Sequence, residues 1–514
     1  MPTLNWGGKN LEIDSINADD LKTKNFRLLE FNHTPIIDKY DFDEKSIIKS
    51  RELSISKKDY GDDWCNLLFW GDNLSVMIYL LKDYSNSLDL IYIDPPFATG
   101  NNFNYKILIG EKSGSEISEA YSDVWSGGID TYISFISDRL KLMKALLSER
   151  GSIYLHLDWH ISHYIKVIMD EIFGKENFRN EIIWAYPAAS AKTRRFFIRS
   201  YDAILFYSKS DNYIFNDDPE IYMEYSNRVK DNLKKDEHGT FYYRGGSHDG
   251  KKLSQKVYLQ EDGIFPRDVW NDIPYIRANT LEYQGFSTQK PERLLKRIIL
   301  ASSNQGDIVA DFFCGTGTTL SVAEKLNRRW IGSDMMVNSI NITKKRILNI
   351  YSSNDLYSWK KRYKSLPKPF NLIIFNGKME DFTIPNNLLK QDLGYDLRIK
   401  NSEPIFTFNV ECQEQLVNIH LLNYIMPKLE LISDRIIKKV NIFSDWIDNW
   451  AVDYDYNEKY FKTSWISFRS YKKRTLKLIS KPYYYEKKGE YIIAVKVGNI
   501  FGGETIQSYK IIIE

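Results

Sequence analysis

Short apolar runs alternate along the chain with segments whose apolar residues recur at helical spacing. Runs of strand length lie at residues 66–70, 90–93, 152–157, 181–184, 201–209, 306–311, 330–334 and 370–376. Helical spacing occurs at residues 75–82, 132–149, 165–173, 293–303 and 320–326. Strands that alternate with helices of this length predict an α/β fold built on a largely parallel sheet.

Two regions depart from this alternation. Between residues 211 and 283 the periodicity is lost, and basic, aromatic and glycine residues become frequent. After residue 351, the pattern predicts an amphipathic helix over 414–426 that Pro427 would end. The remaining chain alternates apolar and polar residues in short runs, as at 491–497, which predicts a small antiparallel β module.

The chemistry is most legible where the run 90–93 ends at Asp94-Pro95-Pro96-Phe97. Two consecutive prolines cannot donate to a sheet ladder, so a stiff turn is expected at the carboxyl edge of the sheet, where α/β proteins bind ligands. The exocyclic amino group of adenine or cytosine is a poor nucleophile because its lone pair is delocalised into the ring. Asp94 and the Pro95 carbonyl could accept its two hydrogens, and Phe97 could stack on the base. A proline turn without catalytic function is the alternative that this tetrapeptide leaves open.

A second turn follows the strand predicted at 306–311. The sequence Phe312-Phe313-Cys314-Gly315-Thr316-Gly317-Thr318-Thr319 leads into a helix, which is typical of nucleotide-type sites because glycines allow close backbone approach. Leu320 replaces the third glycine of a dinucleotide fingerprint, and no GxxxxGK[ST] occurs, so dehydrogenase and P-loop functions are disfavoured. The next strand ends at Asp334, where a carboxylate can accept from both ribose hydroxyls.

Chain length and net charge limit the number of domains and the way in which the chain could bind nucleic acid. The 514 residues leave room for two to four domains, and 70 Lys and Arg against 68 Asp and Glu give a net charge of +2. A nucleic-acid surface must therefore come from local clusters, and the candidates are Lys192, Arg194, Arg195, Arg199, Lys251 and Lys252. A solvated basic turn is the alternative for the first cluster.

Three further features argue against a secreted or membrane protein, a disulfide framework and a metal site. The N-terminus has no secretory pattern and no apolar segment has membrane-spanning length, so a cytoplasmic protein without membrane contact is expected. The three cysteines form no CxxC pair, which disfavours a disulfide framework or structural zinc. His156, Asp158, His160 and His163 span a strand end, a turn and a helix start, so they should point apart and no metal site is expected.

The motifs DPPF, TQKP, DFFCGTGTT and IGSD, in this order, resemble the β-group of DNA amino-methyltransferases, which includes the modification subunits of type III restriction-modification systems. The resemblance covers residues 66–350 and implies that Asp94, Pro95, Pro96 and Phe97 hold the target amino group. It also implies an S-adenosylmethionine site at Asp72, Thr288, Lys290, Asp311, Phe313, Gly315, Gly317, Thr318 and Asp334. Phe97 stands where tyrosine is commoner, which keeps the stacking face and removes a hydroxyl. Asp72 could equally cap the helix that follows it.

The fold implied is a Rossmann-like methyltransferase sheet with an inserted recognition region and a mainly β C-terminal module. The expected divisions are an N-terminal extension, 1–65; a catalytic half, 66–210; a target-recognition region, 211–284; a cofactor half, 285–350; and a DNA- or partner-binding α+β module, 351–514.

The function implied is site-specific methylation of adenine N6 in a flipped-out base of double-stranded DNA. Cytosine N4 methylation and a role as the recognition subunit of a restriction complex are the alternatives. Methylation at cytosine carbon 5 would need a cysteine nucleophile, and the chain has no Pro-Cys pair. A restriction endonuclease subunit and a second copy of the chain are the further partners expected.

Overall fold

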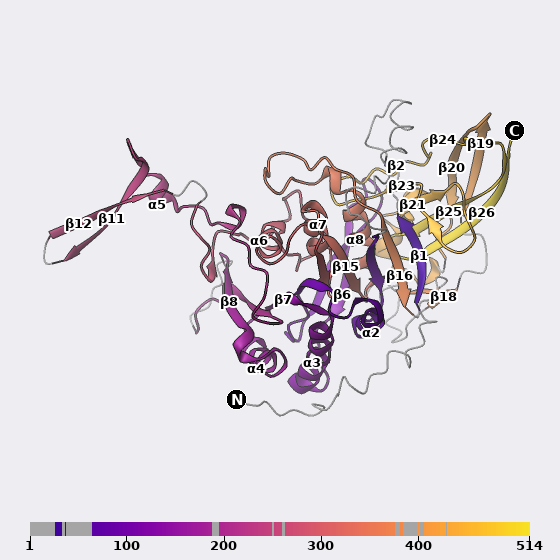
Figure 1. The fold of residues 1–514 in the computed structure, drawn as a ribbon. Helices are drawn as coiled ribbons and strands as arrows, with labels where there is room; N and C mark the ends of the chain where they lie inside the picture. The colour runs from indigo at the N-terminus through magenta and orange to yellow at the C-terminus, as the bar shows by residue number, and fades with distance from the viewer. Residues whose placement is uncertain are drawn as a thin grey trace.

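The structure, a computed structural model, describes residues 26–32, 36–37, 64–187, 195–248, 251–259, 263–375, 381–383, 398–400, 406–427 and 429–514. These ranges form a helix-covered sheet with a β-rich module at one end and a projecting arm at the other (Figure 1). No described helix is both long enough and apolar enough to cross a membrane.

Within the described ranges, eleven strands form the main sheet, in the order β13-β8-β9-β7-β4-β14-β15-β3-β16-β1-β22. Their bounds, in that order, are Val269–Trp270, Phe178–Ala185, Tyr201–Ser208, Leu147–Leu157, Leu88–Ile93, Ile308–Asp311, Arg329–Asp334, Asn66–Trp70, Phe370–Phe375, Phe26–Asn32 and Phe461–Lys462. The run from β7 to β16 is parallel, and β9 and β1 flank it antiparallel. The predicted α/β sheet is confirmed.

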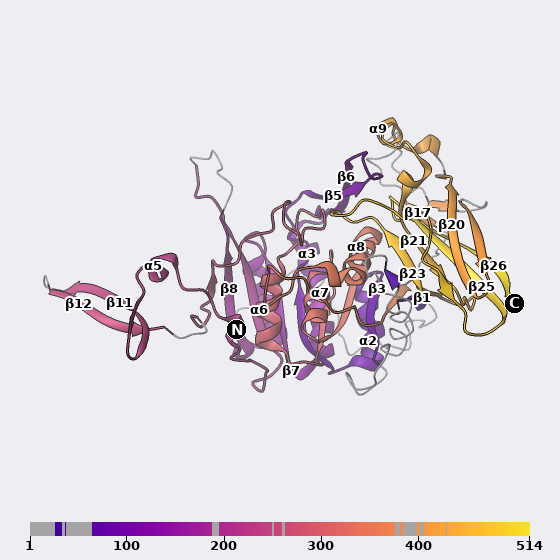
Figure 2. The ribbon, with the colours of Figure 1, turned by 90° about the horizontal axis from the view of Figure 1, so that it is seen from above.

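Helices cover both faces of this sheet because its central strands are apolar on both sides. In β4, Leu90 and Tyr92 pack toward one face, and Ile91 and Ile93 toward the other. The first face carries α6 (Glu292–Ser302), α7 (Thr318–Lys325) and α8 (Val337–Leu348). The second carries α2 (Asn73–Tyr84), α3 (Gly128–Leu146) and α4 (Ser162–Phe173) (Figure 1). Figure 2 looks down on the first face, with α6, α7 and α8 toward the viewer.

The pairing of β4 with β14 brings the two predicted turns together. Leu90 lies opposite Val309 and Ile91 opposite Ala310 in a parallel ladder, with β15 on the other side of β14. The chain therefore leaves β4, β14, β15 and β3 at the same carboxyl edge, which is where ligands bind in such sheets.

The projecting arm is a three-stranded antiparallel sheet of β10 (Lys234–Asp236), β11 (Gly239–His248) and β12 (Lys251–Tyr258) (Figure 1). It belongs to the region where the sequence shows no clear period. Its described side chains are mostly exposed or half-exposed, so few positions require an apolar residue. Short elements join the arm to the body: η4 (Pro219–Ile221) and α5 (Asn227–Lys230).

The predicted C-terminal β module is confirmed, but the helix predicted at 414–426 is wrong. Val417, Ile419 and Leu421 are buried on one face of a strand, β20 (Leu416–Tyr424), so the period is two. Strand β20 pairs with β19 (Phe406–Gln413) and β24 (Tyr483–Tyr484). The second sheet contains β2 (Ile36–Ile37), β23 (Trp465–Phe468), β21 (Ile447–Asp453), β25 (Gly489–Asn499) and β26 (Glu504–Ile513). Other short elements are β17 (Asp381–Thr383), β18 (Arg398–Lys400) and α9 (Asp434–Ile437).

A hairpin links the main sheet to this module. It consists of β5 (Asn102–Leu108) and β6 (Ser115–Ser122), which follow the DPPF turn. Tyr105 and Ile107 share a buried core with Trp450 of the module. At the hairpin tip, Lys439 Nζ lies 2.6 Å from Glu116 Oε1. The module is therefore packed directly on the segment that follows the DPPF turn.

A buried ion cluster links the N-terminal strand β1 to helix α8 and to strand β25. Glu30 of β1 is fully buried and pairs with Lys344 of α8 and Lys496 of β25. The two lysines hold the pKa of Glu30 at about 2 against the effect of its burial. Glu504 also pairs with both lysines, so removing either one would leave two carboxylates to share a single cation at a buried site, which is costly.

Candidate active site

The carboxylate of Asp94 lies at the end of β4 and is held on one side only. Lys290 Nζ, just before α6, lies 2.5 Å from Asp94 Oδ2. Asp94 Oδ1 is buried and has no hydrogen-bond partner among the described residues. A buried acceptor without a donor is costly unless a ligand completes it. Oδ1 is therefore a ready acceptor for an amino group that enters the turn.

Phe97 supplies the aromatic face of the turn. Its ring lies 6.1 Å from the His156 ring, centroid to centroid, with 16° between the planes. Lys290 Nζ lies 5.3 Å from the Phe97 centroid. Because one face of Phe97 is backed by His156, a base could stack only on the remaining surface.

His156 is a site residue that the sequence did not reveal. It is fully buried, and its two ring nitrogens lie 2.9 Å from Tyr92 Oη and 3.0 Å from Asp202 Oδ2. Tyr186 Oη donates to Asp202 Oδ1 at 2.9 Å. Bonds from His156 and Tyr186, with the charge of Lys290, lower the pKa of Asp202 despite its burial. Only the strand pairing places this histidine beside the DPPF turn, so a sequence motif gives no signal for it.

Asp123 holds the backbone that directly follows Phe97. The sequence motifs do not point to this residue either. Its buried carboxylate accepts from the backbone N–H groups of Ala98 at 2.9 Å and Thr99 at 2.7 Å. It also accepts from Thr99 Oγ1 at 2.9 Å and Trp125 Nε1 at 3.0 Å. Ala98 has a φ of +55°, which costs energy in a residue with a side chain. The hydrogen bonds that Asp123 accepts offset that cost.

Hydrogen bonds to Asp311 hold the shape of the turn that contains Gly315 and Gly317, which we call the glycine turn. This buried carboxylate accepts from Phe313 N at 3.0 Å and from Thr319 Oγ1 at 2.5 Å. Burial raises its pKa to about 7, and the charges of Asp94 and Asp334 add to the shift. Both oxygens are used within the turn, so Asp311 contributes by holding the shape of this loop.

Asp334 is joined to the same turn. Its Oδ2 accepts from Gly315 N at 2.9 Å, and its Oδ1 accepts from Met336 N at 2.8 Å. Burial raises the pKa of Asp334 to about 6. Gly317 has a φ of +70°, and a Cβ there would lie 2.7 Å from Thr343 Cγ2, so glycine is required for this close approach.

The remaining predicted cofactor residues lie around this loop. Thr318 Oγ1 donates to the Lys290 carbonyl at 3.2 Å, which ties the loop to the TQKP segment that also contains Thr288. The Phe313 ring lies 6.2 Å from Phe135 of α3. Asp72 caps α2 through Ser75 N at 3.2 Å and also binds Arg139 Nη2 at 2.9 Å. The capping role of Asp72 is thus observed, and its role toward a cofactor stays a prediction.

The residues present fit S-adenosylmethionine at this edge. Gly315 and Gly317 permit close approach to the start of α7, and Asp334 lies at the end of the adjacent strand. Asp94 follows the end of β4 at the same edge, and its Oδ1 has no partner among the described residues. A donor on the glycine turn and a base on the proline turn would therefore lie on neighbouring strands.

The residues predicted to contact DNA do not all lie in the same part of the described structure. Lys192 and Arg194 lie outside the described residues. The Arg199 guanidinium carbon stacks 3.7 Å from the Trp159 ring centroid, and Arg195 lies nearby in the chain. Lys251 and Lys252 belong to β12 of the projecting arm. The two basic groups therefore lie on different elements.

The histidine-rich segment after β7 forms an ion pair within itself. His160 Nδ1 lies 2.6 Å from Asp158 Oδ2. Among the described residues, no three His, Cys, Asp or Glu side chains form a group that could hold a metal ion.

Comparison with known proteins places this geometry in a family. The chain is 31% identical over 312 residues to the type II methyltransferase M.EcaI of Enterobacter cloacae, which covers 52% of this chain and 66% of that protein. It is 31% identical to the DNA adenine methyltransferase YhdJ of Escherichia coli, covering 55% of this chain and 84% of that protein. It is 25% identical to the probable HindVI Mod subunit of Haemophilus influenzae, covering 60% of this chain and 55% of that subunit.

The family model described as DNA methylase, which comprises N6 and N4 methyltransferases, matches residues 88–345, half of the chain. This range contains the proline turn, the TQKP segment, the glycine turn and Asp334. The chain therefore belongs to this family of S-adenosylmethionine-dependent DNA methylases.

Proposed function

We propose that this protein methylates the N6 amino group of adenine at specific sites in double-stranded DNA. The observation that carries the proposal is the half-satisfied carboxylate of Asp94, with Oδ2 on Lys290 and Oδ1 buried without a partner among the described residues. Bound S-adenosylmethionine would supply the methyl group as its carbon–sulfur bond breaks, with the electron pair left on sulfur, and the amino nitrogen would lose its proton to solvent.

The contribution of the chain is to position the amino group and raise its nucleophilicity. Asp94 Oδ1 and the Pro95 carbonyl would accept hydrogen bonds from the two N–H groups. These bonds would draw the nitrogen toward tetrahedral geometry, so that its lone pair is no longer delocalised into the ring and can attack the methyl group. Phe97, backed by His156, would hold the extruded base by stacking. Asp334, Gly315 and Gly317 would hold the donor, with Thr288 and Thr318 beside Lys290.

Adenine is favoured over cytosine by the similarity to a named adenine methyltransferase, of which the chain covers 84%. Methylation at cytosine N4 uses the same two acceptors, and nucleoside analysis separates the two. Unmethylated DNA should be treated with tritiated S-adenosylmethionine, digested to nucleosides and resolved by chromatography. We expect label in N6-methyladenine; label only in N4-methylcytosine would overturn the choice of base.

We further propose that the protein acts in a bacterial restriction-modification system in the cytoplasm. The similarity to type II and type III modification enzymes supports this setting. Sequence recognition would fall to residues 211–284, since an exposed β-ribbon can enter the major groove. A restriction subunit and a second copy of the chain are the proposed partners. Co-purification from the native host, with the mass in solution, tests both.

A further inference from the structure

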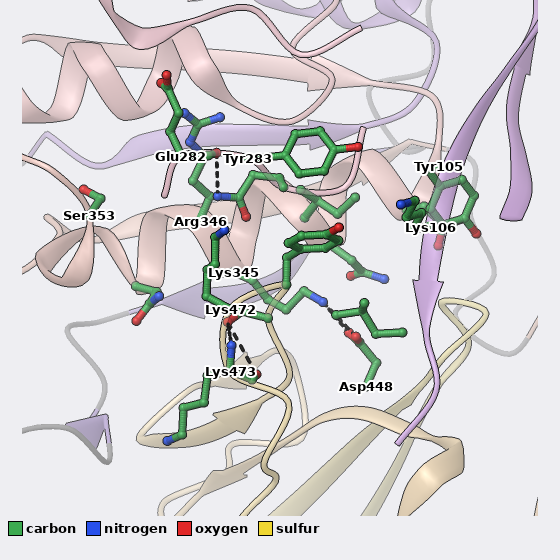
Figure 3. A pocket seen from close by; sticks show the side chains of 18 of the residues that line it. Tyr105, Lys106, Glu282, Tyr283, Lys345, Arg346, Ser353, Asp448, Lys472 and Lys473 are labelled. Carbon is green, nitrogen blue, oxygen red and sulfur yellow. Dashed lines mark hydrogen bonds and ion pairs between the residues drawn. The ribbon is translucent and has the colours of Figure 1, made fainter. Parts of the chain in front are cut away.

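A groove lies over the outer face of α8, between the methylase body and the C-terminal module. It encloses about 260 Å³, and its lining includes Tyr105–Leu108 of β5, Leu281–Gln284, residues of α8 and the module loop 470–473. Figure 3 shows these side chains converging from the body and from the module. We call it the α8 groove.

Positive charge is in excess in the α8 groove. Lys345 binds Asp448 (Figure 3), and Arg346 binds Glu292, so these four residues neutralise one another. The other basic residues of the lining have no carboxylate within ion-pair distance in the described part of the chain: Lys106, Arg362, Lys472 and Lys473. Glu282 is the remaining acid of the lining.

Glu282 carries only part of a negative charge near neutral pH. Burial, together with the neighbouring charge of Glu292, raises its pKa to about 7. Its Oε2 also accepts from Glu292 N at 2.9 Å. A polyanion entering the groove would therefore meet four unneutralised cations and at most one partly charged acid.

Aromatic rings and amides accompany the cations. The rings of Tyr283 and Tyr471 meet edge to face with centroids 5.1 Å apart, across the junction of body and module. Asn338 Nδ2 donates to Tyr105 Oη at 2.5 Å. Lysines interleaved with tyrosines and amides suit a nucleic acid, which offers phosphates, sugar oxygens and the flat faces of bases.

Two walls of the α8 groove belong to chain segments that lead to and from the candidate active site. Strand β5 leaves the DPPF turn, and residues 281–284 lead directly to Lys290. The two walls are joined, since Lys106 N donates to the Gly285 carbonyl at 3.2 Å. The Gln289 side chain braces the second wall by bonding Gln284 N and the Glu282 carbonyl, each at 2.7 Å. DNA held at Asp94 would therefore lie next to this groove.

We propose that the α8 groove binds the sugar-phosphate backbone of the DNA being methylated, and that loop 470–473 gives the C-terminal module this DNA-clamping role. The proposal rests on the proposed function, because it takes DNA as the substrate.

The test replaces Lys472 and Lys473 with glutamine in the full-length protein. Binding to a fluorescein-labelled duplex of mixed sequence is followed by anisotropy over a range of salt concentrations. Each lost phosphate contact should lower the slope of log K against log salt by about 0.9, so we expect a slope smaller by about 2 and an affinity lower by roughly tenfold. The matched control is K487Q/K488Q, which changes two exposed lysines of the same module away from the groove.

The expected kinetic pattern is a raised KM for DNA with kcat and S-adenosylmethionine affinity unchanged. K106Q, on the opposite wall, should also weaken DNA binding, and it carries the test if the double variant fails to fold. Affinity and salt slope equal to those of the control would overturn the proposal, as would an effect of K106Q without one of K472Q/K473Q. A wild-type protein that binds DNA through these lysines but transfers no methyl group would overturn the proposed function alone.

Discussion

Lys290 Nζ lies 2.5 Å from Asp94 Oδ2, although the two residues are separated by almost two hundred positions in the chain. The ion pair joins the proline turn to the segment that precedes α6. It orients the carboxylate, and it leaves Oδ1 as the acceptor for a substrate. The structure thus holds Asp94 in a fixed position without using its full hydrogen-bonding capacity.

Replacing Asp94 with alanine should abolish methyl transfer, with a loss of at least about 100-fold in kcat, because the acceptor for the amino group is removed. Binding of S-adenosylmethionine, measured by calorimetry, should change little because the glycine turn is intact. Asp83→Ala, at an exposed position, is the control. Transfer at the wild-type rate by D94A would remove Asp94 from the mechanism.

Phe97→Ala should lower kcat/KM for DNA by roughly 10-fold to 100-fold, since stacking of a base on an aromatic ring is worth about 1–3 kcal/mol. Phe97→Tyr should keep activity within a few-fold because the ring face is retained. Steady-state methylation of plasmid DNA measures both. Equal losses in the two variants would show that the ring does not act by stacking.

Asp123→Asn should lower kcat by about tenfold or more, because an amide cannot accept from all four donors that now bind the carboxylate. The affinity for S-adenosylmethionine and the melting temperature should stay close to wild type if the effect is confined to the turn after Phe97. Asp130→Asn changes an exposed carboxylate nearby and serves as control. If D123N instead loses kcat only in proportion to lost folded protein, Asp123 is structural and does not position the turn.

The raised pKa of Asp334 predicts a pH dependence of cofactor affinity. Its carboxyl has a pKa of about 6, so it is ionised above that pH and becomes protonated as the pH falls through it. Acceptance of ribose hydroxyls favours the ionised form, so S-adenosylmethionine affinity should be full near pH 7.5 and fall below pH 6. Calorimetry across this range measures the affinity. Asp334→Asn should bind more weakly at neutral pH and lose the dependence; an unchanged pH profile in D334N would assign the titration to another group.

Much of the site followed from the sequence because its motifs end strands that lie side by side. The turns at Asp94 and Gly315 carry recognisable residues, and a parallel sheet brings strand ends to one edge. His156 and Asp123 carry no such signal, because their roles depend on which strand pairs with β4 and on where the β5–β6 hairpin returns. The alternation at Val417, Ile419 and Leu421 was misread as helical, since apolar residues in a short segment fit either period.

The most direct measurement is the structure of the protein bound to duplex DNA and S-adenosylhomocysteine. We predict an adenine turned out of the helix and stacked on Phe97, with its amino nitrogen about 3 Å from Asp94 Oδ1. We also expect the sulfur of the cofactor product on the same side, next to the glycine turn. A target base bound away from Asp94, or a cofactor bound elsewhere than the edge shared by β4 and β14, would contradict these predictions.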